Sequence, residues 1–176
     1  ALPPSRYGVV GVCLGVHGVS RDNRMIFAPY YSLDKELAGR LTESLKIPVY
    51  LYNEANLSVL GERAFAFNFP DMIHISIHSG VGMGILIHDR LYTGANGFAG
   101  ELGHTIVEPD GRPCPCGNHG CLEQYISERA LLQELSEQKG YPVSLDELIR
   151  LSRNEDPDAL RIHERFLKYM SIGLNN

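Results

Sequence analysis

The spacing of apolar residues changes along this chain and predicts alternating strands and helices. Residues 7–16 are almost continuously apolar and rich in β-branched side chains, which is typical of a strand buried on both faces. Residues 47–52 have the same character, and a helix is expected between the two strands, at about 33–45. This order of strand, helix and strand predicts a parallel sheet with a crossover helix, and therefore an α/β fold.

The remaining pattern predicts a strand pair followed by loops and helices. Apolar residues recur at helical spacing over 55–66, so a helix is expected just after Asn53-Glu54. Residues 72–77 and 84–88 predict the two strands of a hairpin, and residues 94–120 are rich in Gly, Pro, Asn and Cys, which favours irregular loops. Three more helices are expected, at 127–138, from the capping pair Ser144 and Glu147 onward, and at about 158–172.

The charge balance limits the partners of this chain. The formal net charge is −5 and the pI about 5.8. An acidic module is poorly suited to direct contact with nucleic acid, whose affinity comes largely from Lys and Arg on phosphates. Any DNA binding is therefore expected to lie outside this chain. No stretch approaches the roughly 18 apolar residues of a membrane span, and the first six residues lack a secretory signal, so a cytoplasmic protein without membrane contact is expected.

The four cysteines are unevenly distributed. Cys13 lies in the first apolar run and is expected to be a buried thiol, whereas Cys114, Cys116 and Cys121 crowd one short loop. Two disulfides would fit a secreted chain, but this distribution favours a metal clip and one separate thiol.

Thiolates and a neutral imidazole are the ligands that tetrahedral zinc prefers. Gly117 and Gly120 allow the close turns that three converging sulfurs need. The spacing leaves the fourth ligand open between His104 and His119. The alternative interpretation is a surface loop of free or disulfide-bonded cysteines. A closed zinc site of this kind would be structural.

Three further motifs carry candidate ligand-binding groups, each with a purely structural alternative. In the segment 97–104, Glu101 and His104 would share a face of a local helix and suit hydrogen bonding to neighbouring sugar hydroxyls, or else belong to a solvated Gly-rich turn. Asn53 and Glu54 stand where a strand ends and a helix begins, which is typical of ligand sites in α/β sheets and equally of helix capping. Gly80, Gly82 and Gly84 would cradle phosphate through backbone N–H groups, or simply form a hairpin turn.

Taken in order, these motifs resemble the signature of the ROK family of sugar kinases and sugar-responsive repressors. The resemblance rests on Asn53-Glu-Ala-Asn56, the glycine hairpin, Gly100-Glu-Leu-Gly-His104 and Cys114-Pro-Cys-Gly-x-x-Gly-Cys-Leu-Glu123. It implies an actin-like ATPase (ribonuclease H-like) fold of two lobes, present here as a fragment. Residues 1–64 would be part of the N-terminal lobe, without its first phosphate-loop hairpin, and residues 65–176 the C-terminal lobe, with a zinc loop at about 104–121.

The resemblance also implies the roles of individual residues. Sugar hydroxyls would be contacted by Asn53, Glu54, Glu101, His104 and Glu123. Zinc would be held by His104, Cys114, Cys116 and Cys121, which favours His104 over His119. His104 would then link the metal to the sugar, so that zinc organises the pocket.

Two departures from the kinase pattern favour the repressor branch, similar to xylose-type repressors. Kinases of the family carry Asp, the general base, where Glu54 stands here, and a misplacement of ~1 Å can cost roughly a hundredfold in rate. The amino-terminal Asp-x-Gly-Gly-Thr phosphate loop is absent from the chain, and phosphoryl transfer depends on positioning by such loops. The expected function is therefore that of a sugar-binding effector domain, with DNA contacted through a helix-turn-helix outside this chain.

Two other functions stay open at this point. An ATP-dependent sugar kinase, with Glu54 as its base, is the first alternative, and an inert zinc-stabilised assembly module is the second. A homodimer or homotetramer is expected by analogy with the family. The sugar itself is not specified, because the hydroxyl-binding residues are shared between family members.

Overall fold

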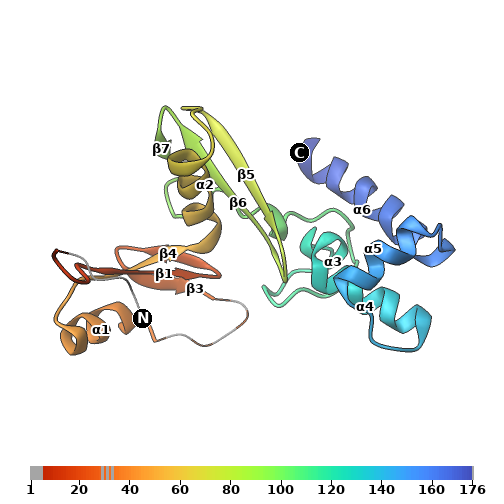
Figure 1. Ribbon diagram of the computed structural model, residues 1–176, viewed down its shortest axis with the longest axis horizontal. Helices are drawn as coiled ribbons and strands as arrows, with labels where there is room; N and C mark the ends of the chain where they lie inside the picture. The colour runs from red at the N-terminus through yellow and green to blue at the C-terminus, as the bar shows by residue number, and fades with distance from the viewer. Residues whose placement is uncertain (1–5, 29, 31, 33, 176) are drawn as a thin grey trace. The chain divides into compact units, whose positions relative to one another are not determined.

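The computed structural model describes residues 6–28, 30, 32 and 34–175 and divides into two units. Unit 1 consists of Ala1–His74 and Gly84–Ala99, and unit 2 of Ile75–Met83 and Gly100–Asn176. The elements are labelled in Figure 1. The two lobes expected from the sequence, 1–64 and 65–176, stay a prediction.

Unit 1 contains the predicted strand, helix and strand. Strand β1 (Val12–Val16) pairs in parallel with β4 (Val49–Asn53), and helix α1 (Leu37–Leu45) lies between them in the sequence. The predicted α/β arrangement is therefore confirmed here, with a shorter first strand and a shorter helix. Leu33, the start of the expected helix, lies outside the described residues.

The prediction that the first strand is buried on both faces, with Cys13 as a buried thiol, is wrong. Burial alternates along β1, because successive side chains of a strand point to opposite faces. Val16 belongs to a core with Val49, Leu51 and Ala38, whereas Cys13 is exposed on the other face.

A hairpin that the apolar pattern did not predict follows β1. Strands β2 (Val19–Arg21) and β3 (Arg24–Phe27) are antiparallel, and Asp22 and Asn23 between them both have positive φ, as a tight hairpin turn requires. The Asn23 amide donates to the Val49 carbonyl at 2.8 Å and accepts from the Leu51 N–H at 2.6 Å. This side chain therefore holds the hairpin turn against β4.

The next elements follow the predicted order closely. Helix α2 (Glu54–Phe65) begins at the predicted position, and strands β5 (Met72–Ile77), β6 (Val81–Ile87) and β7 (Arg90–Leu91) form one sheet in that order. Gly84 allows β6 to approach α2, because a Cβ at this position would lie within 2.7 Å of the Val59 side chain.

Unit 2 is mostly helical. Its helices are η1 (Leu102–His104), α3 (Glu123–Ile126), α4 (Glu128–Lys139), α5 (Leu145–Arg153) and α6 (Pro157–Asn175). One core contains Leu122, Tyr125, Ile126 and Tyr169, and a second core lies among α4, α5 and α6. The expected cap of α5 is present, since the Ser144 hydroxyl accepts from the Glu147 N–H at 3.2 Å.

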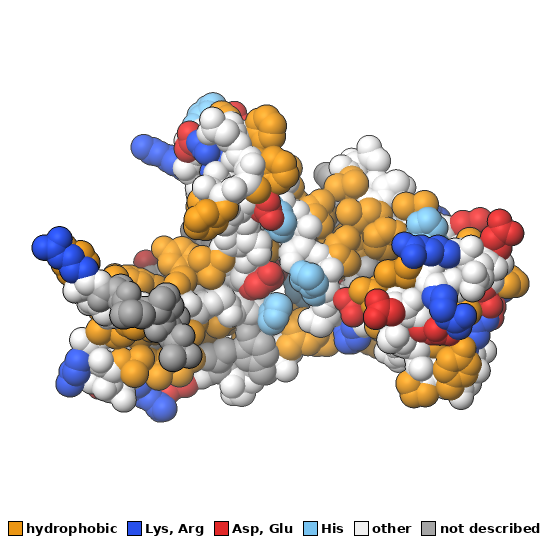
Figure 2. Space-filling view, viewed as in Figure 1, with side chains coloured by type: hydrophobic (Ala, Val, Ile, Leu, Met, Phe, Trp, Pro, Cys, Tyr) orange, Lys and Arg blue, Asp and Glu red, His pale blue; other side chains and the backbone are white. Residues whose placement is uncertain are grey.

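Over α4 to α6, Figure 2 shows acidic and basic side chains interspersed on the surface. Ion pairs in these helices join Lys139 to Asp156 and Arg150 to Glu147. Within residues 6–28, 30, 32 and 34–175, no helix combines the length and the apolar character that crossing a membrane requires.

Candidate metal centre and adjoining carboxylates

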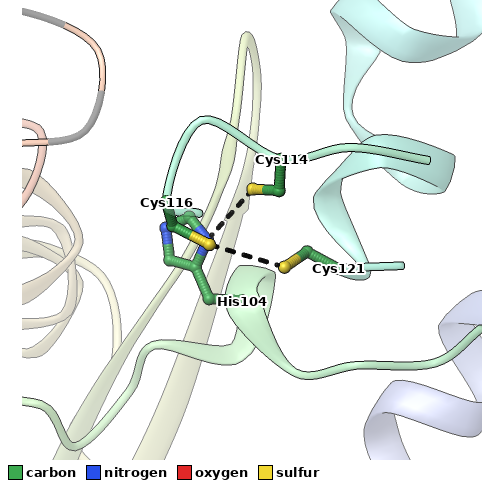
Figure 3. Close-up of side chains that lie close together, drawn as sticks. All are labelled: His104, Cys114, Cys116 and Cys121. Carbon is green, nitrogen blue, oxygen red and sulfur yellow. Dashed lines mark hydrogen bonds between the residues drawn. The ribbon is translucent and has the colours of Figure 1, made fainter. Parts of the chain in front are cut away.

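Unit 2 brings together one histidine and three cysteines. The ligand atoms of His104, Cys114, Cys116 and Cys121 all lie within 4.8 Å of one another. Figure 3 shows the four side chains converging, with Cys114 Sγ 3.6 Å from His104 Nδ1 and Cys116 Sγ 3.6 Å from Cys121 Sγ. All four cysteines of the chain are free thiols. Three soft sulfurs and one imidazole nitrogen around one point are a donor set that suits a tetrahedral metal ion.

The loop that carries the sulfurs is closed by its own backbone. The Cys114 N–H donates to the Asn118 carbonyl, and the Gly117 N–H donates to the Cys114 carbonyl, both at 2.9 Å. Gly117 and Gly120 have φ of 97° and 74°, a region that glycine adopts without steric cost. These turns return the chain within seven residues, so that Cys121 faces Cys116.

The structure distinguishes between the two candidate histidines. His119 is exposed and forms an isolated antiparallel β-bridge with Pro113, and its ring is not among the four converging ligand groups. His104 lies at the end of η1, where its backbone N–H donates to the Glu101 carbonyl at 3.0 Å. The local helix that would place Glu101 and His104 on one face is therefore present.

Glycines allow the segment before His104 to pass close to β6. A Cβ on Gly100 would overlap the Met83 carbonyl oxygen, and a Cβ on Gly103 would overlap the Val81 carbonyl oxygen. The Gly-Glu-Leu-Gly-His sequence thus has a packing role as well as its polar side chains.

Burial makes two thiols of this cluster, Cys114 and Cys121, weaker acids by raising their pKa values. Burial, together with the hydrogen bond to Cys116, raises the pKa of Cys121 to about 11, and burial is also the main cause that raises the pKa of Cys114. A metal ion favours the deprotonated sulfur, so binding at this cluster would release protons.

Two carboxylates adjoin the cluster. Glu123 is buried at the start of α3, and its Oε1 accepts from Cys114 Sγ at 3.2 Å and lies 3.8 Å from His104 Nδ1. Glu101 Oε2 lies 3.9 Å from the other ring nitrogen, Nε2. The pKa of Glu101 is raised above its ordinary value. Burial is the main cause, His104 partly offsets it, and the negative charge of Glu123 adds to it. Three of the five predicted sugar-binding residues are thus brought together.

The predicted glycine turn lies beside the same carboxylates. A Cβ on Gly80 would lie 3.3 Å from Glu123 Oε2, and the His78 N–H donates to the Gly80 carbonyl at 3.0 Å. Gly84 has the packing role against α2 described above. Phosphate binding by Gly80, Gly82 and Gly84 stays a prediction.

Asn53 and Glu54 belong to unit 1 and have local roles there. The Asn53 side chain caps α2 by accepting from the Asn56 N–H at 3.0 Å, and it donates to the Gly18 carbonyl at 2.8 Å. Glu54 Oε1 accepts from the Ser58 hydroxyl at 3.2 Å. The capping expected as the alternative is present, and a pocket shared by these residues with Glu101, His104 and Glu123 stays a prediction.

Sequence reasoning missed Gln124. This side chain is buried directly after Glu123, and its amide donates to both Glu123 and Cys114. The only sequence signal was its position beside a predicted ligand-binding carboxylate.

The chain matches the family model described as the ROK family over residues 2–176. It is 37% identical over 179 residues to the xylose repressor of Bacillus subtilis (strain 168), an alignment that covers 99% of this chain and 46% of that protein. The chain therefore spans about half the length of the curated relatives it matches.

Two solved structures are similar across most of the chain. A ROK family glucokinase from Streptomyces griseus, in complex with glucose and AMPPNP, has a TM-score of 0.81 at 30% identity, covering 91% of this chain and 58% of that chain. A ROK family transcriptional regulator, a homologue of the E. coli MLC protein, has a TM-score of 0.76 at 26% identity, covering 93% and 45%. These neighbours have the actin-like ATPase fold, so the fold class expected from the sequence is confirmed.

Proposed function

This chain belongs to the ROK family, and we propose that it is the sugar-sensing part of a bacterial transcriptional regulator of carbohydrate metabolism. The similarity to xylose repressors supports the regulator branch. The complete protein would bind DNA through a helix-turn-helix outside this chain, in the cytoplasm and as a homodimer or homotetramer. A sugar acts as an effector in such a protein only if it binds one conformation more tightly than the other.

One observation carries the proposal. The His104 ring lies between two chemical environments, with Nδ1 toward the cysteine sulfurs and Nε2 toward the Glu101 carboxylate. An imidazole ring whose Nδ1 is fixed by the metal cluster would present its Nε2 to a sugar hydroxyl in one orientation. The Glu101 and Glu123 carboxylates supply the acceptors that hydroxyl groups need. Asn53 and Glu54 of unit 1 would complete the hydroxyl-binding set.

We propose that the histidine and cysteine cluster holds zinc. The residues fit this ion, because His104, Cys114, Cys116 and Cys121 offer four N and S ligand atoms within 4.8 Å. Bound zinc would supply structural stabilisation of the loop. The chain's own contribution is to orient the imidazole and to carry Glu123, two residues after Cys121, beside it.

Glu54 supports sensing rather than catalysis. The family resemblance implies Asp as the base of the kinases, and the longer Glu54 side chain is directed into a hydrogen bond with the Ser58 hydroxyl of its own helix. The second candidate function, an ATP-dependent sugar kinase, is supported by the glucokinase neighbour with bound glucose and AMPPNP.

Calorimetry on the complete protein tests the proposal, with xylose, glucose and N-acetylglucosamine as the sugars. We expect one of them to bind, and Glu101→Gln to weaken binding by about 10- to 100-fold, because hydrogen bonds to charged groups contribute about 1.5–3 kcal/mol. Glu137→Gln, a change at an exposed residue of α4, is the matched control and should leave binding unchanged.

A coupled assay for ADP release with the same sugars separates the two functions. We expect no sustained turnover with Glu54 in place. Sustained ADP release by the unaltered protein would reject the regulator assignment in favour of the kinase. No sugar binding by the zinc-loaded protein would reject both.

A further inference from the structure

Gln124 occupies a position between the metal cluster and its neighbouring carboxylate. The residue lies in α3 and is 8% exposed. Its Nε2 donates to Glu123 Oε1 at 3.0 Å and to Cys114 Sγ at 3.5 Å. One amide group therefore contacts both a candidate metal ligand and a candidate sugar ligand.

The position matters because Cys114 Sγ and Glu123 Oε1 are only 3.2 Å apart. In the free thiol, Cys114 can donate its own hydrogen to the carboxylate. A sulfur that binds a cation has lost this hydrogen, so two electron-rich atoms then face each other at short range in a buried site. An N–H donor shared by both atoms compensates for the lost hydrogen bond without adding a charge, and the Gln124 amide is placed to do so.

The orientation of this amide is set by a second residue. Arg129, on α4, donates from Nη2 to Gln124 Oε1 at 3.4 Å and from Nε to the Ser79 carbonyl at 3.3 Å. A guanidinium donates only, so it selects the amide orientation in which oxygen faces Arg129 and nitrogen faces Cys114 and Glu123. The Glu128 N–H donates to the His78 carbonyl at 2.8 Å, which holds the start of α4 against the same β5–β6 turn.

We propose that Gln124 is a positioning residue of the metal site, which strengthens metal binding by donating to the Cys114 sulfur and the Glu123 carboxylate together. Arg129 supports this role by fixing the amide. The inference rests on the zinc site of the proposed function. Hydrogen-bonding partners around metal ligands typically change metal affinity by about 10- to 100-fold, and this is the size of effect expected from Gln124.

Zinc affinity of the complete protein, measured by competition with a chromogenic chelator, tests this role. Gln124→Met keeps the length of the side chain and removes the donor, and should weaken zinc binding by about 10- to 100-fold. Gln124→Glu also keeps the shape but replaces the donor with a third carboxylate, and should weaken binding at least as much. Arg129→Met, at an exposed position, should have a smaller effect in the same direction.

Gln133→Met is the matched control, because the Gln133 amide is exposed and donates to Glu137 in the same helix. It should bind zinc as the unaltered protein does. The absorption spectrum of the cobalt-substituted protein reports the ligand set independently of affinity, and Gln124→Met should retain the thiolate bands.

The outcomes separate the two levels of the proposal. Zinc bound equally tightly by the unaltered protein, Gln124→Met and Gln124→Glu would overturn the role of Gln124 and leave the zinc site standing. No zinc binding by the unaltered protein would overturn both. Loss of zinc affinity in Gln124→Met but not in Gln124→Glu would also overturn the role of Gln124. Packing of a polar group, rather than donation of a hydrogen bond, would then explain the result.

Discussion

Replacing Gly120 with alanine should weaken zinc binding by the cysteine loop more than the same change at Gly117, three residues away. Both glycines have positive φ, 74° at Gly120 and 97° at Gly117, so an alanine at either position costs about 1–2 kcal/mol of backbone strain. The surroundings differ. A Cβ on Gly117 would meet nothing within 4 Å, whereas a Cβ on Gly120 would overlap the Glu108 carbonyl oxygen.

The overlap cannot be relieved by a side-chain movement, because the obstructing atom is backbone. The segment around Gly120 would have to separate from its neighbour. The hydrogen bonds at risk are Val107 N–H to Gly120 O at 2.9 Å and Gly120 N–H to Arg112 O at 2.8 Å. Each contributes about 0.5–1.5 kcal/mol net, so with the backbone strain Gly120→Ala should cost about 2–5 kcal/mol.

Zinc affinity is the appropriate measurement, because a loop distorted by the substitution must return to its closed form before its three sulfurs can bind one ion. Gly117→Ala should weaken zinc binding by about 5- to 30-fold, and Gly120→Ala by about 30-fold or more, at a factor of ten for each 1.4 kcal/mol. Hydrogen exchange at the Val107 amide should accelerate in Gly120→Ala alone. Equal effects of the two substitutions on both measurements would refute the reasoning.

Two further outcomes follow from the charges and the cysteines of the chain. Burial works against ionisation of Glu134, but hydrogen bonds from Arg112 and Arg165 outweigh it and hold the pKa of Glu134 below its ordinary value of 4.5. The stability from this pairing is present above pH 4.5 and is lost as the pH falls through the lowered pKa. Glu134→Gln should therefore lower the free energy of unfolding at neutral pH by about 1–3 kcal/mol and make its decline in acid less steep. Denaturant titrations at several pH values would measure both effects, and an unchanged acid profile would contradict the reasoning. Cys114→Ser should weaken zinc binding by more than about a hundredfold, whereas Cys13→Ser, at an exposed thiol outside the cluster, should not change the metal content measured by elemental analysis.

The sequence by itself was sufficient for the order of the longer elements and for the family. Continuous apolar runs located β1 and β4, helical patterns located α2, α4 and α6, and the Ser144–Glu147 capping pair located α5. The motif from Gly100 to Glu123 specified the ROK resemblance that the comparisons confirm. These features are local, because spacing and composition within about ten residues determine which backbone conformation buries apolar side chains.

Other features were decided only by contacts between distant residues. The apolar run around Cys13 suggested a buried thiol, but the side-chain alternation of β1 leaves Cys13 exposed. The β2–β3 hairpin, too short for a periodic signal, depends on Asn23 binding the backbone of β4.

The same holds for the site. Spacing left His104 and His119 as equal candidates, and the close approach of the Gly100–Gly103 backbone to β6 brings His104 to the sulfurs. Gln124 carried no signal of its own, and its contacts with Cys114 and Arg129 exist only because α3, α4 and the cysteine loop pack together. A sequence records which groups are available, but hydrogen bonds act over about 3 Å, so their partners are set by the packing of segments far apart in the chain.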